Sequence, residues 1–417
     1  MALTYQQSKL VKNTVPALRE HGERITSLFY NSMLRDHPEL NNYFNTVNQK
    51  NGRQPRALTA VILQFASNIM HISELIPKLE RMCNKHCSLG IQPEHYGIVG
   101  KYLIQAFAEV LGPDMTPDVR AAWTAAYWVL AKMMIGRETQ LYKNFDRWVG
   151  WRKFKIDRKV AEADDMYSFY LVPVDGRPLP SFLPGQYVSL QIHVPDIGYD
   201  QSRQFSLSEA PRPDYYRICV KRDQGMVYRN SVATSYINPG ILTNELIDHY
   251  HPGDTVDLSH PAGEFFLDTN NTSSVPVVLV SAGVGVAPMV SILNTIAATQ
   301  PGRQISWVHG SRRTVPFDEH LRSLRRRFPD SLRTNIFKTD LAGSDLAGVH
   351  YDFDERVDLA KVKREDLFLE HGGTEYYICG PEQFMLEMAE YIRDQGVDLH
   401  RVKFELFSTG TFASTMK

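Results

Sequence analysis

The sequence predicts a multidomain protein in which an all-α domain is followed by an antiparallel β-barrel and then by an α/β domain with a parallel sheet. Three sequence patterns predict this order of domains: a helical period up to about residue 147, short alternating strands after it, and glycine-bounded apolar runs between amphipathic helices near the end. A chain of 417 residues is long enough for two or three compact units. We place these units at 1–147, 151–268 and 269–417.

The first unit is expected to be helical because its apolar residues follow helical spacing and few β-branched residues alternate. Helix-stop signals interrupt the pattern at "HPEL" (37–40) and at "GPDMTPD" (112–118). The texture changes within "NFDRWVGWRKF" (144–154), which we interpret as the first boundary.

The second unit contains short alternating runs such as "MYSFYLVPVDG" and "GQYVSLQIHV", separated by Pro, Gly and Asp, and these predict an antiparallel barrel. The polar, turn-rich stretch "LDTNNTSS" (267–274) marks the second boundary. Beyond it, buried runs such as "QISWVHG" and "YYICG" alternate with helical stretches, which predicts a parallel sheet covered by helices.

Composition narrows the class of partner. Lys and Arg total 46 against 47 Asp and Glu, so no net field favours nucleic acid or an acidic membrane surface. No run of about eighteen apolar residues occurs, and the first residues resemble neither a signal peptide nor a mitochondrial presequence. Four scattered cysteines do not make a disulfide framework. We expect a cytoplasmic monomer that needs no membrane and acts on small molecules.

The stretch "CNKHC" (83–87) is a candidate metal site. A zinc site would need a fourth ligand, and no second pair of closely spaced ligands follows. The alternative uses His86 alone, because a lone imidazole on an apolar helix stripe suits haem iron. A hydrogen-bonded core histidine would give the same pattern. The stripe consists of Leu75, Leu79, Met82, His86 and Leu89.

A haem pocket would also need a distal wall with a polar group and an aromatic lid. Tyr30 and Phe44 stand among apolar neighbours, and Gln54, Leu58 and Ile62 follow at four-residue steps on one helical edge. These residues are therefore candidates for that wall.

The loop "SAGVGVAP" (281–288) follows an apolar strand and precedes a helix. Glycine allows the backbone to approach a dinucleotide phosphate, and a helix amino terminus favours its negative charge. The loop lacks the G-x-G-x-x-G spacing with a later acidic residue, so an ordinary Rossmann dehydrogenase is disfavoured.

Taken together, these motifs resemble the flavohaemoglobins, in which a globin is fused to a ferredoxin-reductase-like module. The matching segments are "NQKNGRQPRAL", "KHCSLGIQPEHYGIVG", "IGRE", "RQFSLS", "YYICGPEQFM" and "VKFELFSTG", and they span the chain in the family's order. The resemblance implies haem b, FAD and NAD(P)H as cofactors, with FAD in the barrel and NAD(P)H in the last unit.

On the haem side, the resemblance makes His86 the proximal ligand and the two neighbouring cysteines bystanders. A carboxylate that accepts the other imidazole N–H would make the histidine more electron-donating. The remaining roles that it implies are a distal pair (Tyr30, Gln54), haem packing (Phe44, Leu58), a proximal network (Tyr96, Glu138) and tuning of the potential (Lys85). Taken singly, Glu138 would be a surface carboxylate and Tyr96 a packing aromatic.

For FAD, the resemblance gives Arg203 the pyrophosphate, Phe205 the isoalloxazine face and Ser206 the flavin edge. The family usually has tyrosine at the position of Phe205, and a lost neutral hydrogen bond costs about 0.5–1.5 kcal/mol. The other implied FAD residues are Tyr187, Gln204, Gly240, Thr243, Asn244 and Phe407. Glu405, near the reactive edge of the flavin, is a second residue that would tune the redox potential.

For NAD(P)H, the resemblance implies the glycine loop, the Cys-Gly-Pro motif and the strand end at "HGSRR". Ala287 stands where the family has threonine. Arg312 and Arg313 would pair with a 2′-phosphate or be solvated, which leaves NADH against NADPH open. The segment 225–240 is longer than the family usually has. The implied residues are Gly283, Val284, Gly285, Val286, Ala287, Pro288, Arg312, Cys379, Gly380 and Pro381.

The resemblance implies a nitric oxide dioxygenase. Electrons would pass from NAD(P)H to FAD and singly to haem, which with bound oxygen would convert nitric oxide to nitrate. Two alternatives stay open: an oxygen-storing or sensing globin kept ferrous by its own reductase, and a general NAD(P)H-dependent ferric or quinone reductase.

Overall fold

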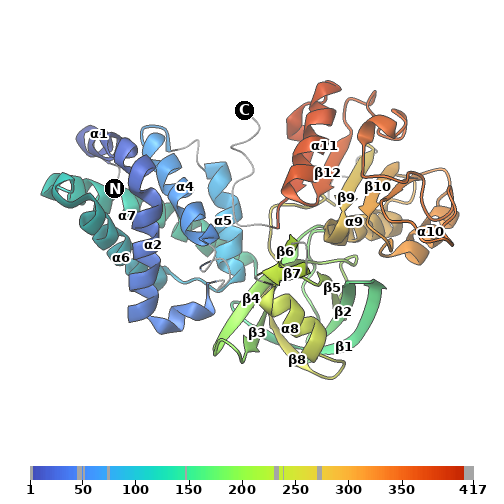
Figure 1. Cartoon of the computed structure of the whole chain (residues 1–417), viewed down its shortest axis with the longest axis horizontal. Helices are drawn as coiled ribbons and strands as arrows, with labels where there is room; N and C mark the ends of the chain where they lie inside the picture. The colour runs from blue at the N-terminus through green and yellow to red at the C-terminus, as the bar shows by residue number, and fades with distance from the viewer. Residues whose placement is uncertain are drawn as a thin grey trace.

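The computed structural model describes residues 3–44, 49, 52–72, 76–145, 148–229, 234–237, 239–269 and 275–407. Figure 1 shows three lobes: a helical lobe in blue and teal, a green lobe of strands, and a yellow-to-red lobe of strands and helices. The predicted fold class is confirmed. Leu75, Asp146 and Arg147 lie outside the described residues, and the two boundaries proposed between the three units stay predictions.

The helical lobe is punctuated by proline as the sequence predicts. Pro38 opens a 3-10 turn after α2 has ended at Asp36, and Pro117 opens α7 after the Thr116 hydroxyl has capped it. The elements are α1 (Tyr5–Asn13), α2 (Val15–Asp36), η1 (Pro38–Asn42), α4 (Arg53–Ser67), α5 (Ile76–Ser88), α6 (Pro93–Leu111), η3 (Gly112–Asp114) and α7 (Pro117–Asn144).

Packing within this lobe arranges two groups of helices. Helix α2 packs on α4 and α6, and the buried hydroxyls of Thr26 and Thr59 lie 2.9 Å apart between α2 and α4. Helix α5 packs on α7. Figure 1 shows α5 on the side of the helical lobe that faces the other two lobes.

The second lobe is an antiparallel sheet in the order β4-β3-β8-β1-β2-β5. Leu207, just beyond β4, bridges to Ile218 of β5, so the two edges meet and the sheet curls into a barrel. Its elements are β1 (Arg152–Ala163), β2 (Met166–Pro173), β3 (Tyr187–Val194), β4 (Tyr199–Ser206), β5 (Tyr216–Lys221), α8 (Ile241–His249) and β8 (Thr255–Leu258). Within the long segment 225–240, β6 (Met226–Arg229) pairs with β7 (Thr234–Ile237) as an antiparallel ribbon.

The third lobe is a parallel sheet in the order β11-β10-β9-β12-β13. Alternate residues of β9 enter two separate cores, Val277 and Leu279 beneath α9 and α10, and Val278 and Val280 beneath α11. The elements are β9 (Val277–Ala282), η4 (Gly283–Gly285), α9 (Val286–Thr299), β10 (Ile305–Ser311), α10 (Asp318–Arg327), β11 (Leu332–Lys338), η5 (Leu359–Lys361), β12 (Glu375–Cys379), α11 (Glu382–Asp394), η6 (Leu399–Arg401) and β13 (Val402–Glu405).

The helical lobe and the barrel touch directly. The Phe145 ring, at the end of α7, stacks on the ring of His260 with centroids 4.2 Å apart. The backbone N–H of Asp200 in β4 donates to the side chain of Asn42 at 2.9 Å. These contacts hold α5 close to the barrel.

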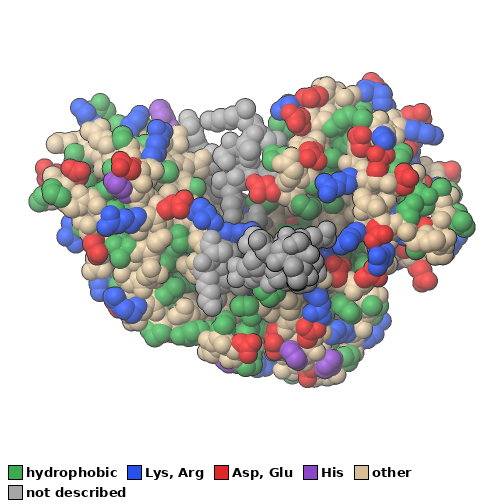
Figure 2. Space-filling model, in the orientation of Figure 1, with side chains coloured by type: hydrophobic (Ala, Val, Ile, Leu, Met, Phe, Trp, Pro, Cys, Tyr) green, Lys and Arg blue, Asp and Glu red, His purple; other side chains and the backbone are tan. Residues whose placement is uncertain are grey.

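On the face drawn in Figure 2, acidic and basic side chains are interspersed across the left and right halves of the view, with no large patch of one sign. In the described part of the chain, every helix is too short or too polar to cross a lipid bilayer.

Candidate functional site

The buried carboxylate of Glu138 in α7 joins two other helices of the helical lobe. Its Oε1 lies 2.8 Å from Nδ1 of His86 in α5 and 2.6 Å from the hydroxyl of Tyr96 in α6. The Tyr96 hydroxyl oxygen also lies 3.1 Å from Nδ1 of His86. The structure thus brings together three residues that are spread over 52 positions of the sequence.

This contact determines the tautomer of His86. Tyr96 donates its hydroxyl hydrogen to Glu138, and an ionised carboxylate can only accept, so Nδ1 of His86 must carry the hydrogen. Nε2 then keeps its lone pair, and it makes no hydrogen bond with any described residue. The side chain is 29% exposed. An imidazole with a free lone pair, whose opposite N–H is held by a carboxylate, can serve as an axial ligand of haem iron.

The two cysteines of the "CNKHC" stretch point elsewhere. The Sγ atoms of Cys83 and Cys87 approach the backbone carbonyls of Met134 and Glu138 in α7. Burial raises the pKa of Cys83 to about 12 and that of Cys87 further above its ordinary value. Among the described residues, no three His, Cys, Asp or Glu side chains gather closely enough to share a metal ion. The zinc interpretation is therefore not supported.

A second polar pair lies between α2 and α4. The Nε2 of Gln54 donates to the hydroxyl of Tyr30 at 3.4 Å, and the Phe44 ring meets the Tyr30 ring edge-on at 5.4 Å between centroids. Leu58 packs beside them in the same apolar cluster. Burial raises the pKa of Tyr30 to about 12, so the hydroxyl keeps its hydrogen at neutral pH. The predicted distal residues thus lie together.

Two predicted tuning residues have shifted pKa values. Burial, together with the positive charges of Arg81 and Arg203, lowers the pKa of Lys85 to about 8. Burial raises the pKa of Glu405 to about 8, with Glu264 adding to the rise and Arg81 opposing it. Lys85 on α5 and Glu405 on β13 come from opposite ends of the chain.

Arg81 is a residue that the sequence did not reveal. Its guanidinium donates to the backbone carbonyl of Leu406 and lies 3.8 Å from the carboxylate of Glu264. It stands four residues before Lys85, on the same face of α5. The four-residue spacing from Lys85 indicates in the sequence that Arg81 shares its helix face. No local sequence feature, however, shows that this face meets the other two lobes.

The flavin motif "RQFSLS" forms the end of β4. Burial lowers the pKa of Arg203 to about 10, and its Nη1 donates to the Ser202 carbonyl at 2.6 Å. Phe205 is 8% exposed and packs in the barrel's apolar cluster. Ser206 pairs with Tyr187 across β3 and β4, and burial raises the pKa of Tyr187 above its ordinary value.

The predicted pyrophosphate segment lies at the start of α8. Gly240 precedes the helix, and the side chain of Asn244 bonds both the backbone N–H and the carbonyl of Asp223, at 3.1 and 2.9 Å. The hydroxyl oxygen of Thr243 is buried and has no hydrogen-bond partner among the described residues. An orphaned buried hydroxyl near a helix amino terminus fits a phosphate oxygen.

The glycine loop and the Cys-Gly-Pro motif meet at the carboxyl ends of β9 and β12. Gly283 has φ 55°, a left-handed conformation that favours glycine. A Cβ on Gly285 would lie 2.2 Å from the carbonyl oxygen of Cys379. Val286, Ala287 and Pro288 begin α9, and Gly380 and Pro381 lead into α11. The structure thus joins both predicted motifs where parallel sheets bind dinucleotides.

The two arginines after β10 differ in their surroundings. Arg313 pairs with Asp340 at 2.9 Å, whereas exposed Arg312 has no ion pair with any described residue. Just before them, both ring nitrogens of buried His309 are hydrogen-bonded, to Ser281 at 2.8 Å and to Ser311 at 2.9 Å. Burial lowers the pKa of His309 to about 3. A neutral imidazole therefore links the strand before the glycine loop to the strand before the arginines.

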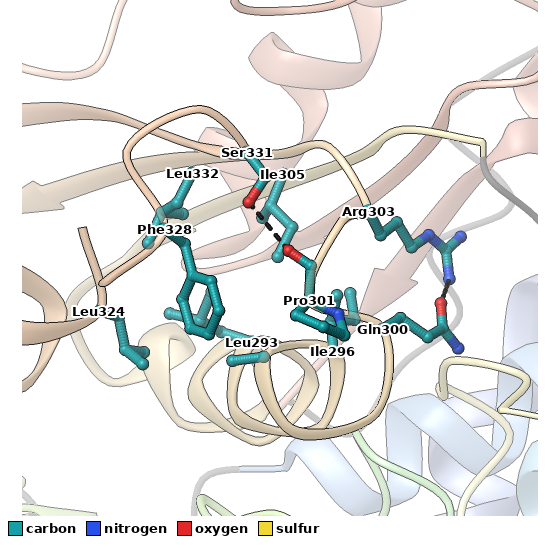
Figure 3. A pocket seen from close by; sticks show the side chains of 11 residues that line it. Leu293, Ile296, Gln300, Pro301, Arg303, Ile305, Leu324, Phe328, Ser331 and Leu332 are labelled. Carbon is teal, nitrogen blue, oxygen red and sulfur yellow. Dashed lines mark hydrogen bonds between the residues drawn. The ribbon is translucent and has the colours of Figure 1, made fainter. Parts of the chain in front are cut away.

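Two further features complete the placement. Phe407 is 47% exposed at the end of the described chain. Figure 3 shows a small apolar pocket between α9 and α10, lined in part by Ile305 and Leu332. These residues begin β10 and β11, so the pocket lies at the end of the sheet opposite the glycine loop.

Comparison with known proteins agrees with this layout. Residues 27–134 match the family model "Globin", and residues 279–390 match "Oxidoreductase NAD-binding domain". The flavohemoprotein of Bordetella parapertussis is 42% identical over 97% of this chain and 98% of that protein. The flavohemoprotein of Bacillus subtilis is 38% identical over 96% of each chain.

Solved structures show the same relationship. A flavohemoglobin from Malassezia yamatoensis with bound FAD and heme superimposes with a TM-score of 0.82 at 28% identity, covering 98% of this chain and 100% of that one. The FAD/NAD-binding domain of a nitric oxide dioxygenase from Vibrio cholerae matches 62% of this chain and 99% of its own, at 30% identity and a TM-score of 0.53.

Proposed function

Because the chain belongs to the flavohemoprotein family, we propose that it is a nitric oxide dioxygenase, which uses NAD(P)H and O2 to convert nitric oxide to nitrate. As a member of that family it is an oxidoreductase that combines a haem-binding globin with FAD- and NAD-binding domains. The proposal adds the reaction and the role of each side chain.

The contact between His86 and Glu138 is the observation that carries the proposal. His86 would hold the haem iron through Nε2, while the 2.8 Å contact from Nδ1 to Glu138 pulls on its hydrogen and increases electron donation toward the metal. Oxygen storage does not need this extra electron donation to the iron, whereas chemistry on bound oxygen gains from it. Tyr96 keeps the carboxylate oriented by its own 2.6 Å hydrogen bond.

Tyr30 would act on the other side of the haem. Its hydroxyl accepts a hydrogen bond from Gln54, so its own hydrogen remains free to donate to a ligand. Buried donors aimed at a developing negative charge stabilise it without reorganisation. Phe44 and Leu58, which pack beside Tyr30, would exclude water and limit the space for the ligand.

When bound, FAD takes a hydride from NAD(P)H and releases its electrons singly, and haem brings oxygen and nitric oxide together. The chain's own residues bind and orient these groups. Arg203 and Thr243 would hold the FAD pyrophosphate. The flavin ring would be held by Phe205, Ser206 and Tyr187. The loop from Gly283 to Pro288 and the Cys379–Pro381 motif would hold the coenzyme.

The balance of 46 basic against 47 acidic residues supports small-molecule partners, namely O2, nitric oxide and NAD(P)H. We further propose that the chain forms three domains, at 1–147, 151–268 and 269–417, and that it works as a monomer in the cytoplasm.

The test is to count nitrate formed per NADH or NADPH consumed while nitric oxide is limiting. Sustained turnover is expected and would exclude mere oxygen storage. His86→Ala should abolish nitrate formation but leave reduction of a soluble ferric acceptor by the same coenzyme. His71→Ala, an exposed histidine of the same lobe, is the control. Full nitrate formation by His86→Ala, or none by the wild type, contradicts the proposal.

A further inference from the structure

The helix that carries His86 presents a second row of side chains to the rest of the molecule. Arg81, Asn84 and Ser88 follow one another on α5 at steps of three and four residues, so they share one helix face. Each reaches a different segment of the barrel or of the last lobe. Asn84 is 5% exposed and Ser88 1% exposed, so this face is covered.

Ser88 belongs to a directed chain of hydrogen bonds that begins in the flavin motif. Gln204 donates to the hydroxyl of Ser189 at 3.0 Å, and Ser189 donates to the hydroxyl of Ser88 at 2.9 Å. Ser88 donates in turn to the carbonyl of Lys85 at 2.8 Å. Each hydroxyl gives one hydrogen and accepts one, so the chain is fully satisfied.

Asn84 makes the second contact. Its side-chain oxygen accepts the backbone N–H of Gly263 at 3.0 Å, and its nitrogen donates to the carbonyl of Glu80 at 3.0 Å. The amide is therefore held on its own helix at one end and on the barrel at the other. A shift of α5 by one residue along the barrel would leave Asn84 and the N–H of Gly263 buried without partners, which is costly.

Arg81 makes the third contact, and it reaches two lobes at once. It donates to the carbonyl of Leu406, between Glu405 and Phe407, and it lies 3.8 Å from the carboxylate of Glu264 in the barrel. Leu406 is 325 positions from Arg81 in the sequence. This residue therefore holds the end of β13, where the predicted flavin-covering residue Phe407 follows.

We propose that Arg81, Asn84 and Ser88 are positioning residues, a docking row that holds the haem-bearing helix in one register on the flavin module and thereby supports electron transfer from FAD to haem. The inference rests on the proposed function in so far as the chain must pass electrons between these two groups. Contacts at three separate segments fix both the position and the rotation of α5. Small displacements matter, because the rate of electron transfer depends on how closely and in what orientation the protein holds the two groups.

The experiment mixes the haem- and FAD-loaded protein with NADH and, separately, with NADPH in the absence of air, and it follows flavin and haem absorbance separately. We compare Arg81→Met, Asn84→Leu and the conservative Arg81→Lys with the wild type. Haem reduction should slow by about 10-fold or more in the first two, while flavin reduction stays within about twofold of the wild type. Arg81→Lys should recover part of the loss.

Arg137→Met is the matched control. Arg137 pairs with Glu80 of the same helix through two bonds of 2.7 Å, but both residues belong to the helical lobe. This variant should reduce its haem as fast as the wild type. Melting temperatures of all variants separate a loss of docking from a loss of folding. If Asn84→Leu does not fold, Arg81→Met alone decides, because its side chain is 37% exposed.

Unchanged haem reduction in Arg81→Met overturns the inference, and so does an equal slowing of flavin reduction. A wild-type haem that neither NADH nor NADPH can reduce would also overturn it. The proposed reaction fails separately: if the variants slow haem reduction as expected but the wild type forms no nitrate from nitric oxide, the docking row stands and the dioxygenase does not.

Discussion

Nδ1 of His86 lies 2.8 Å from Oε1 of Glu138. Glu138 is 3% exposed, and it is held by a residue of a third helix, Tyr96, at 2.6 Å. A buried carboxylate of this kind needs such partners. Glu138 is therefore a buried carboxylate in contact with the imidazole, and not the surface carboxylate that its position in the sequence alone would suggest.

Glu138→Gln keeps the shape of this contact and removes its charge. We expect haem to be retained, because Nδ1 of His86 can still donate to the amide oxygen. Nitrate formation should fall by about 10- to 100-fold, as for other residues that support a metal ligand. Turnover with limiting nitric oxide measures the effect. Thr139→Val, at an exposed neighbouring position, is the control, and an unchanged turnover in Glu138→Gln would contradict the proposed role.

Tyr30→Phe removes the free donor between α2 and α4. Oxygen release should become about 2- to 10-fold faster, the equivalent of about 0.5–1.5 kcal/mol for one neutral hydrogen bond. Flash photolysis or rapid mixing measures the rate. Tyr102→Phe is matched to it, since Tyr102 is also buried but its hydroxyl bonds to Asp36 at 3.0 Å. Equal effects of both variants would point to a general loss of packing.

Gly285→Ala should damage the coenzyme site. The added Cβ would stand 2.2 Å from the carbonyl oxygen of Cys379, and a backbone atom cannot rotate away. We expect a loss of about 1–3 kcal/mol in stability and weaker NAD(P)H binding. Gly302→Ala is the control, because a Cβ there meets nothing within 4 Å. Thermal unfolding and coenzyme titration check the result, and equal behaviour of the two variants would refute it.

Thr243→Val tests the orphaned hydroxyl at the start of α8. The change keeps the shape and removes a group that has no partner among the described residues. FAD affinity should fall by about 2- to 10-fold, while the FAD-free protein keeps its stability. Flavin fluorescence titration measures the affinity. Thr295→Val removes a hydroxyl that bonds to the Ser291 carbonyl at 2.8 Å, and it should leave FAD affinity unchanged.

Glu405 makes stability depend on pH in a defined direction. Its pKa is about 8 in the folded protein against an ordinary value of 4.5. Between these values the native state holds a proton that the unfolded state has lost, so stability declines as the pH rises from about 4.5 to about 8. Glu405→Gln should flatten this decline in urea unfolding of the FAD-free protein. Glu382→Gln, at an exposed position, should not; equal slopes in wild type and Glu405→Gln would contradict the assignment.

Much of the fold follows from local pattern. The proline signals end α2 and open α7, and the alternating strands form the antiparallel barrel, because capping and face alternation depend on neighbouring residues. The cofactor motifs were visible for the same reason. His86 stands on a helix, and Gly283 and Gly285 stand between a strand and a helix, as their spacing predicts.

The amino-acid sequence alone therefore determined the order of the three lobes, the histidine that can hold haem and the glycine loop. Tertiary structure decided which tautomer Glu138 gives His86, that Gly285 meets Cys379, and that Arg81 reaches Leu406. The physical reason is range. Helical period, turns and caps are set within a few positions, whereas these contacts join residues from 52 to 325 positions apart, and only the packing of whole lobes brings such residues together.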